Sequence, residues 1–239
     1  MKKTLAVMLA ALMIFTLFAC GKKAGTEETP QPQDEIASVE ENETPSSAPA
    51  LGAWTVPESP EMTGELLTLF AKAADGLVGA EHVPVAYIGR QAVSGLNHAF
   101  ICREKIISPG TAETYSIVYI YEDTNGKSEI KDIVNTGVET WISDAMGGWT
   151  QAESPVITDE LAGLLKEALE GLLGADYSPV ALLSTQVVAG MNYCVLCEQT
   201  VVYPGAEPEY VFVYMYVDLD GEPQITDIVP CAGDAADAQ

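Results

Sequence analysis

Five cysteines and two histidines are the side chains of this sequence best suited to nucleophilic chemistry or to binding a metal ion. A cysteine nucleophile needs a base held beside it, and nothing in the spacing of His82 and His98 places either ring near a thiol. Asp218 and Asp220 alternate as the first ligands of a calcium loop do, but the later ligand positions are missing. Among 35 Asp and Glu residues, no pair is singled out as a catalytic acid and base. We therefore expect a protein that is not an enzyme and that uses no metal or cofactor.

The charge of the chain excludes several classes of partner. Eleven Lys and Arg stand against 35 Asp and Glu, which gives a formal charge of −24. A nucleic-acid-binding protein needs a basic face to displace counterions, and a protein held by a polybasic segment on a membrane needs clustered Lys or Arg. Because 48% of the residues are hydrophobic, the chain as a whole is not a disordered acidic segment. A folded acidic protein that does not bind nucleic acid remains.

The N-terminal segment carries an export signal. Lys2 and Lys3 precede an apolar run over residues 4–19, which is typical of a secretory signal peptide. The run ends in Leu17-Phe18-Ala19-Cys20-Gly21, which resembles the lipobox of bacterial lipoproteins. That resemblance implies cleavage after residues 1–19, diacylation of Cys20, and a protein anchored in the cell membrane by lipid and facing outside the cytoplasm. The alternative is an ordinary signal peptide that is cleaved nearby.

Beyond Cys20 the sequence is a linker followed by one unit written twice. Residues 20–51 are acidic, rich in Pro, Ser and Thr and poor in aliphatic residues, so we expect them to be disordered. From Trp54 the sequence recurs at an offset of 95, with 34 of 81 aligned positions identical. Two repeats over 52–135 and 147–231 follow, each long enough to be a domain, with a connection over 136–146 and a tail over 232–239.

Each repeat predicts one helix followed by consecutive strands. Thr63 and Thr158 are helix N-cap candidates, followed by an apolar stripe at helical spacing that should end at Gly79 or Gly174. Runs rich in β-branched and aromatic residues come next, separated by turn signals such as Asn125-Gly126. One helix with hairpin-connected strands predicts the α+β class, an antiparallel sheet packed on a helix.

The junction of the first two long strands carries a recognisable motif. In the second repeat it reads Gln186-Val187-Val188-Ala189-Gly190, followed by Met191-Asn192-Tyr193. This resembles the QxVxG signature of the cystatin and stefin family, and a glycine pair before the helix and a hairpin downstream agree with that family. The first repeat has Gln91-Ala92-Val93-Ser94-Gly95 at the same place and a single Gly52 upstream.

The resemblance implies a cystatin-like fold in each repeat, in which one helix is gripped by a curved antiparallel sheet. It also implies a wedge of three loops that enters the cleft of papain-like cysteine proteases and blocks it reversibly, mainly through the second repeat. The residues implied to contact the protease are Gly147, Gly148, Gln186, Val187, Val188, Ala189, Gly190 and Leu219. A weaker second site comprises Gly52, Gln91, Ala92, Val93, Ser94 and Gly95.

Some features depart from the family and keep an alternative open. The second hairpin has Asp218-Leu219-Asp220-Gly221 where cystatins proper have Pro-Trp, so Leu219 is its one apolar candidate. A non-inhibitory binding or spacer lipoprotein on the same scaffold is therefore the alternative function, since one fold supports many functions. Gly190 itself is either a hairpin glycine or a contact residue, and replacing it is expected to weaken inhibition and leave the fold intact.

Aromatic and cysteine residues of the repeats have structural interpretations as well. Trp54 and Trp149 either dock on their own sheets or form part of an exposed edge. Tyr210, Phe212, Tyr214 and Tyr216 alternate along one strand, which predicts packing; the alternative is a surface aromatic stripe that binds glycan or peptide. Cys102 and Cys197 occupy equivalent positions and are expected to be buried. Cys194, three residues before Cys197, should face the other side of its strand. A Cys194–Cys231 disulfide is an open possibility in an extracellular protein.

Overall fold

The computed structural model describes residues 52–143 and 145–231. These residues belong to one compact unit, Ser47–Gln239. The signal peptide predicted over 1–19, Cys20, the linker 20–51 and the tail 232–239 lie outside the described residues. Within the described part, no helix is long and apolar enough to cross a membrane.

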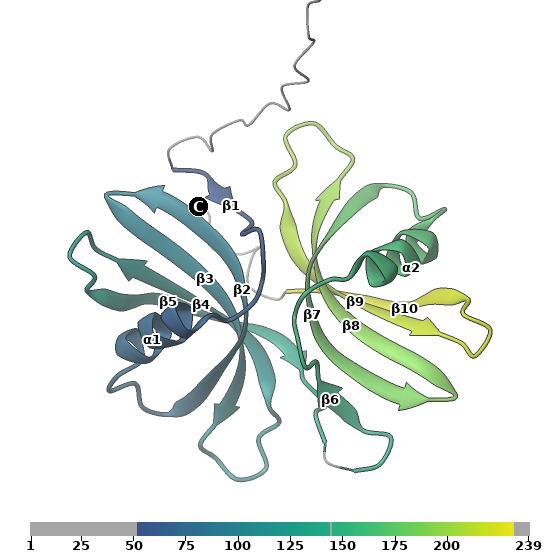
Figure 1. Cartoon of the computed structure of the whole chain (residues 1–239), viewed down its shortest axis with the longest axis horizontal. Helices are drawn as coiled ribbons and strands as arrows, with labels where there is room; N and C mark the ends of the chain where they lie inside the picture. Colours follow the sequence, from purple (N-terminus) through teal and green to yellow (C-terminus); the bar gives the residue numbers. More distant parts are fainter. Residues whose placement is uncertain (1–51, 144, 232–239) are drawn as a thin grey trace, which may run out of the picture. The chain divides into compact units, whose positions relative to one another are not determined.

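Both repeats fold into the same succession of elements (Figure 1). The first repeat contains β1 (Trp54–Thr55), α1 (Gly64–Ala73), β2 (Ala80–Val93), β3 (Gly95–Ile106), β4 (Thr114–Glu122) and β5 (Ser128–Glu139). The second contains β6 (Trp149–Gln151), α2 (Asp159–Leu169), β7 (Ala175–Val188), β8 (Gly190–Val201), β9 (Glu209–Val217) and β10 (Pro223–Pro230). Each repeat forms one antiparallel five-stranded sheet in which strands that follow one another in the chain are neighbours. The predicted α+β organisation is confirmed.

The two helices begin where the sequence predicts. The hydroxyl oxygen of Thr63 accepts a hydrogen bond from the amide of Leu66 at 3.3 Å, and Thr158 does the same for Leu161 at 3.2 Å. Acidic residues occupy the first turn of both helices, where they interact favourably with the helix dipole. Each helix packs its apolar stripe on one face of its own sheet, α1 through Phe70 and α2 through Leu165.

The helix ends differ from the expectation that they lie at Gly79 and Gly174. Helix α1 stops at Ala73 and α2 stops at Leu169. The reason is an earlier pair of glycines, Gly76 and Gly171, which adopt φ values of +83° and +88° that end a right-handed helix at little cost. The apolar residues that follow these glycines therefore leave the helical stripe and lie in an exposed loop.

A third cluster of buried side chains joins the two repeats. Because side chains alternate along a strand, each sheet has a second face turned away from its helix. These faces contact each other, so Ile88, Ile101 and Tyr115 of the first repeat share one cluster with Leu196 and Phe212 of the second. The rings of Tyr115 and Phe212 lie 5.2 Å apart between centroids. The repeats are thus held together by a common core in addition to the core under each helix.

The tyrosine-rich strand β9 supplies much of this common core. Phe212 and Tyr214 are buried in it, and Tyr210 packs against it while its hydroxyl donates a hydrogen bond to the Ile88 carbonyl oxygen at 3.2 Å. The packing role predicted for these residues is confirmed. Tyr216 differs, because it lies near the end of the strand and bonds to a neighbouring hairpin.

The cysteines of the second repeat occupy two different cores. Cys197 packs under α2, whereas Cys194 faces the common core, so the predicted opposite orientation is confirmed. Cys102 is buried under α1, as expected. Cys194 is a free thiol, and the open possibility of a disulfide with Cys231 is not realised. Strand β9 separates them, since Cys194 pairs with Tyr214 while the amide of Cys231 bonds to the Tyr210 carbonyl oxygen.

Candidate functional site

The QxVxG sequence forms the tip of the β7–β8 hairpin. Cα pairing runs from Gln186 opposite Asn192 to Val188 opposite Gly190, which leaves Ala189 at the apex. The side chains of Val187 and Val188 are 66% and 41% exposed. The tip therefore presents two branched apolar side chains to solvent on a short, tightly paired turn.

Gln186 ties this tip to the segment that precedes β6. Its Nε2 donates a hydrogen bond to the carbonyl oxygen of Gly147 at 2.8 Å, and its Oε1 accepts one from Asn192 Nδ2 at 2.7 Å. The adjacent Gly148 has a structural requirement of its own, because a Cβ there would lie 2.8 Å from the Ser143 carbonyl oxygen. The glycine pair is thus placed beside the hairpin tip by a side chain of the motif itself.

The β9–β10 turn lies on the other side of the same tip. The Tyr216 hydroxyl donates a hydrogen bond to the Ala189 carbonyl oxygen, and Gly190 sits against the backbone of Val217. Asp218 Oδ1 accepts hydrogen bonds from the amides of Asp220 and Glu222, both at 2.9 Å. This carboxylate therefore organises its own turn, and Leu219 at the turn is 82% exposed.

Three segments consequently meet at one end of the second repeat. We call this surface the loop edge of the second repeat, made of Gly147–Gly148, Gln186–Gly190 and Asp218–Gly221. Of the residues implied by the family resemblance, all eight lie on it. The first repeat does not cover the edge, since Val187 and Leu219 remain exposed in the folded unit. What it offers is a preformed apolar rim without a nucleophile.

The first repeat builds a corresponding loop edge from Gly52, Gln91–Gly95 and Asp123–Gly126. Gln91 Nε2 donates to the Gly52 carbonyl oxygen at 2.7 Å and Asn97 Nδ2 donates to Gln91 Oε1 at 2.6 Å. The amides of Asn125 and Lys127 bond to Asp123, and these backbone bonds hold the pKa of its carboxyl below the ordinary value.

The chemistry of the first edge is more polar than that of the second. Position 124 carries Thr in place of Leu219, and positions 92 and 94 carry Ala and Ser. Val93 is the remaining exposed branched side chain at this tip. The two edges therefore share a framework and differ in the apolar surface that they offer.

Gly190 needs no contact with a partner to explain it. Its φ is +124°, and a Cβ built on it would overlap the carbonyl oxygen of Val217 and lie 2.9 Å from the Tyr216 ring. Gly95 repeats this arrangement against Glu122 and Tyr121 in the first repeat. The expectation that a bulky residue at 190 would leave the fold intact is therefore wrong, because the neighbouring backbone would have to move.

Tyr216 supports the loop edge, a role that the alternation of aromatic residues along its strand does not predict. It was grouped with the packing residues of its strand, yet its hydroxyl holds the apex of the neighbouring hairpin. Tyr121 does the same in the first repeat, where its hydroxyl donates to the Ser94 carbonyl oxygen at 2.6 Å. The identity of this residue in both copies, beside a polar turn, was the available signal.

The two tryptophans partly fulfil both of the roles predicted for them, docking on their own sheets and forming part of an exposed edge. Trp54 stacks edge-on against Tyr119 at 5.6 Å and Trp149 stacks against Tyr214 at 5.8 Å. Each ring therefore docks on its own sheet beside the glycine segment. Trp54 is still 45% exposed, so part of its surface is also available at the edge.

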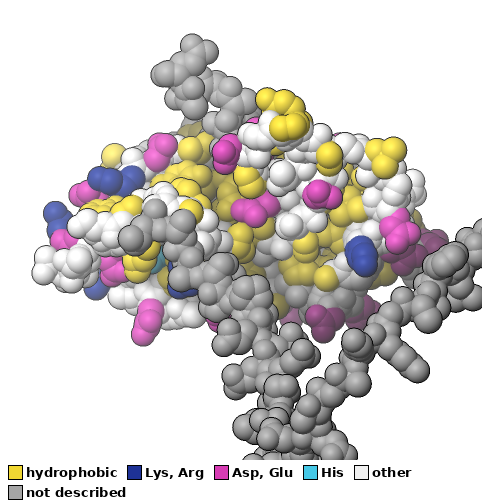
Figure 2. Space-filling model, turned by 90° about the horizontal axis from the view of Figure 1, so that it is seen from above, with side chains coloured by type: hydrophobic (Ala, Val, Ile, Leu, Met, Phe, Trp, Pro, Cys, Tyr) yellow, Lys and Arg dark blue, Asp and Glu magenta, His cyan; other side chains and the backbone are white. Residues whose placement is uncertain are grey.

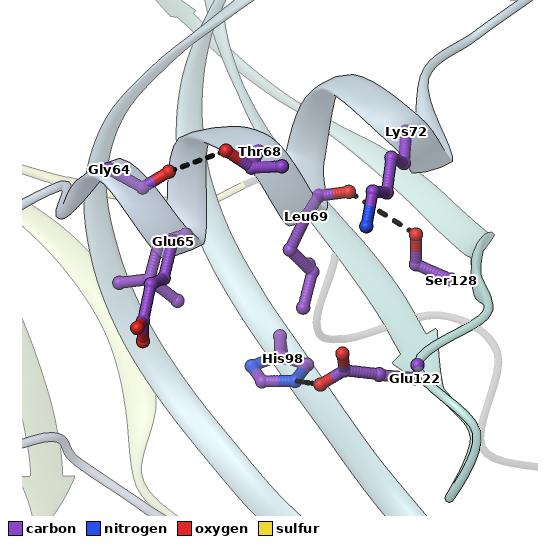
Figure 3. A pocket seen from close by; sticks show the side chains of 10 residues that line it. Gly64, Glu65, Thr68, Leu69, Lys72, His98, Glu122 and Ser128 are labelled. Atoms are coloured by element: carbon purple, nitrogen blue, oxygen red, sulfur yellow. Dashed lines mark hydrogen bonds and ion pairs between the residues drawn. The ribbon is translucent and has the colours of Figure 1, made fainter.

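Apart from the loop edges, a hollow lies under α1, and the titratable residue His98 lines it (Figure 3). Its volume is about 470 Å³. His98 Nδ1 lies 3.0 Å from the Tyr87 hydroxyl, and its Nε2 lies 3.5 Å from Glu122 Oε2. Burial lowers the pKa of His98 in spite of the neighbouring Glu122, and burial raises the pKa of Tyr87 to about 12. We interpret the contacts of His98 with Tyr87 and Glu122 as support for the start of β3, because they join it to β2 and β4.

Metal binding has no candidate in the part of the chain that the structure describes, where no group of three or more His, Cys, Asp and Glu side chains is placed to hold an ion. The loop edge of the second repeat brings together exposed apolar side chains and backbone segments that are held by side-chain hydrogen bonds.

Comparison with known proteins does not assign the chain to a family. No protein-family model matches the chain, and no curated protein sequence is significantly similar to it. The loop edges and the motif that they carry are therefore the features of this chain that bear on its function.

Proposed function

We propose that this protein is a lipid-anchored, extracellular inhibitor of papain-like cysteine proteases, built from two cystatin-like repeats. The second repeat acts as the main inhibitor, and its loop edge blocks the protease cleft reversibly. The observation that carries the proposal is the side-by-side arrangement of the glycine pair, the QxVxG tip and the β9–β10 turn, connected through Gln186 and Tyr216.

The physical basis is a wedge that is ordered before it binds. Val187, Val188 and Leu219 are exposed side chains that lose water when a cleft closes over them. Fully burying one such side chain contributes about 1.5–3 kcal/mol. Because hydrogen bonds already fix the neighbouring backbone, binding costs little further conformational entropy. The edge contributes shape and apolar contact and needs no reactive group.

The charge of the second repeat bears on the choice of protease. Between Trp149 and Val229 there is one basic residue, Lys166, against thirteen acidic residues. Such a surface accelerates association with a positively charged protein and slows it with a negatively charged one. We therefore propose that the target protease is basic around its cleft.

The predicted anchor places this activity at the membrane surface. Cys20, if diacylated, would hold the chain through two or more acyl chains, which is sufficient for stable attachment. The linker 20–51 would then separate the inhibitor from the lipid. Metabolic labelling with a fatty-acid analogue tests this part, and a Cys20→Ser variant that stays labelled would contradict it.

The inhibitory part is tested with the chain from Gly21 onward, which retains the whole compact unit. It is titrated against papain with a fluorogenic peptide substrate, together with a Val187→Asp variant. Leu173→Asp serves as the matched control, because Leu173 is 96% exposed in the α2–β7 loop and not part of the loop edge. We expect inhibition by the parent and by Leu173→Asp, and at least tenfold weaker inhibition by Val187→Asp. Equal inhibition constants for the two variants would argue against the loop edge.

A non-inhibitory binding or spacer lipoprotein on this scaffold is the second candidate. It is favoured by the acidic β4–β5 and β9–β10 turns, since Asp123, Asp218 and Asp220 offer little apolar contact. Absence of inhibition at micromolar concentration across several papain-like proteases, with the chain shown to be folded, would select this candidate.

A further inference from the structure

Two loops of the second repeat, at the end opposite its loop edge, expose a group of apolar side chains. The α2–β7 loop carries Leu173, and the β8–β9 loop carries Val202 and Tyr203, all of them largely exposed. The Val202 amide donates a hydrogen bond to the Gly174 carbonyl oxygen at 2.8 Å, so the two loops lie together. We call this surface the apolar end of the second repeat, made of Leu172–Gly174 and Val201–Tyr203.

The first repeat has an apolar end of the same construction. At the offset of 95, the places of Leu172, Leu173, Val201 and Val202 are taken by Leu77, Val78, Ile106 and Ile107. Val78 is 88% exposed where Leu173 is 96% exposed, and the Ile107 amide bonds to the Gly79 carbonyl oxygen at 3.1 Å. Clustered apolar side chains that face solvent are typical of a contact surface for a partner or a membrane.

The chain enters the folded unit beside the apolar end of the second repeat. Trp54, at the start of the first repeat, borders the same hollow as Glu207 and Pro208 of the β8–β9 loop. In Figure 1, β1 and the β8–β9 loop are both at the top, and the β3–β4 loop of the first repeat is at the bottom. Figure 2 looks onto the upper side and shows hydrophobic side chains exposed between acidic and uncharged ones. An anchor at the N-terminal end of the chain is therefore attached on the side of the second apolar end.

The length of the linker lets this end reach a bilayer. The linker has 31 residues between Cys20 and Gly52, the first described residue. A flexible coil of that length has a root-mean-square span of about 30 Å. It is long enough to hold the unit off the bilayer and short enough to bring it back. Since a short tether keeps two surfaces at a high effective concentration, a contact too weak to hold a free protein is sufficient.

Strands β7 and β8 separate the apolar end from the loop edge. Their Cα pairing runs from Ala175 opposite Val201 at the apolar end to Val188 opposite Gly190 at the loop edge. Strand β7 has 14 residues, and a strand of this length spans about 40 Å. If the apolar end rests on a bilayer, the loop edge is directed away from it.

We propose that the apolar end of the second repeat rests in the interfacial layer of the membrane that holds the Cys20 anchor, and thereby presents the loop edge outward. Aliphatic side chains enter the boundary of the acyl region, and a tyrosine ring suits the headgroup level. The exposed acids Glu170 and Asp176 flank the α2–β7 loop, so neutral headgroups are preferred to anionic ones. This inference rests on the proposed attachment of Cys20 and does not depend on protease inhibition.

The test uses the chain from Cys20, coupled through that thiol to a maleimide lipid in phosphatidylcholine vesicles, with most vesicles carrying a single chain. The cysteines of the described part are buried, so Cys20 is the reactive thiol. Hydrogen exchange, followed by mass spectrometry, compares the coupled chain with the same chain alkylated at Cys20 in solution. Leu173→Asp places a charge in the apolar end of the second repeat, and Val78→Asp does the same at the matched position of the first repeat.

We expect coupling to slow amide exchange at least about threefold in 171–176 and 201–206, and to leave 76–81 and 106–111 unchanged. Leu173→Asp should abolish this slowing, Val78→Asp should preserve it, and phosphatidylglycerol in the vesicles should reduce it. No slowing, equal slowing at the two apolar ends, or slowing that survives Leu173→Asp would overturn the proposal. Slowing seen only when many chains share a vesicle would also overturn it, because a second copy would then cover the end.

The same variants separate this inference from the proposed function. Leu173→Asp should inhibit papain as the parent does, and Val187→Asp should keep the slowed exchange on vesicles. Because the coupling to lipid is chemical, a chain that takes up no fatty-acid label identifies the natural anchor as the proposal that has failed. Unchanged exchange on the coupled vesicles identifies the membrane contact instead.

Discussion

Gln186 and Gln91 make the same bonds at equivalent places in the two repeats, and replacing each by alanine separates stability from function. Each side chain holds a glycine carbonyl and an asparagine amide, at 2.8 and 2.7 Å for Gln186 and at 2.7 and 2.6 Å for Gln91. The structural loss is therefore matched between the variants. A difference in inhibition must then come from the edge on which the residue lies.

The magnitude follows from the two bonds. A hydrogen bond contributes about 0.5–1.5 kcal/mol net, and both glutamines are partly exposed, so the lower half of the range applies. We expect either substitution to destabilise the ordered conformation of its loop edge by about 1–2 kcal/mol. If the loop must be ordered again on binding, the binding free energy is weaker by the same amount. The inhibition constant then rises about fivefold to thirtyfold.

The assay compares inhibition constants against papain for the parent, Gln186→Ala and Gln91→Ala, with urea unfolding of all three. We expect similar small losses of stability in both variants and weaker inhibition in Gln186→Ala alone. Weaker inhibition in Gln91→Ala alone would show that the first repeat is the inhibitor. Unchanged inhibition in both variants would refute the role of an ordered edge.

Further predictions concern the buried parts of the repeats. Phe212→Ala should lower the free energy of unfolding by about 3–5 kcal/mol, because the ring lies in the common core. Urea should unfold the parent in a single transition, because both repeats share that core. Two separate transitions would contradict a shared core. Burial lowers the pKa of His98 despite Glu122, so the unfolded chain binds more protons just below pH 6.5, and the free energy of unfolding should fall as pH drops through that range. His98→Tyr should reduce this fall in urea titrations at pH 5.5 and 7.5. Burial also raises the pKa of the Cys194 and Cys197 thiols to about 12, so both should resist iodoacetamide until the chain is unfolded, as mass spectrometry of the native and denatured protein would show.

Local signals in the sequence predicted the elements of each repeat well. Thr63 and Thr158 cap the helices because their spacing to the apolar stripe is a short-range property. The helix ends were misplaced because each repeat offers two glycines within four residues, and the stripe continues past the first of them. Both glycines of each pair adopt a positive φ, and the pattern of apolar residues does not state which of them ends the helix.

The contact between the repeats was beyond the reach of the sequence pattern. The alternation of Tyr210, Phe212 and Tyr214 indicates a packed face, and a pattern within one strand does not say what covers it. Here the cover is the equivalent face of the other repeat, around Ile88 and Tyr115. Long-range docking of this kind depends on the three-dimensional shape of both sheets.

The candidate site was predictable to the extent that it is carried by a motif. The tip Gln186–Gly190 and the glycine pair were named from the sequence, and the structure places them side by side through the Gln186 side chain. The roles of Tyr216 and Gly190 required coordinates, because each depends on the neighbouring hairpin. Gly190 in particular is required by the backbone of Val217, so its presence alone says nothing about a partner.

The central claim is that the loop edge of the second repeat occupies the cleft of a papain-like protease without being cleaved. The most direct measurement is the inhibition constant of the unmodified chain from Gly21 against papain, at several substrate concentrations, with mass spectrometry of the chain afterwards. We expect competitive, reversible inhibition at micromolar or lower concentration and an intact bond between Ala189 and Gly190. Full protease activity at tens of micromolar chain, or cleavage within Gln186–Gly190, would contradict it.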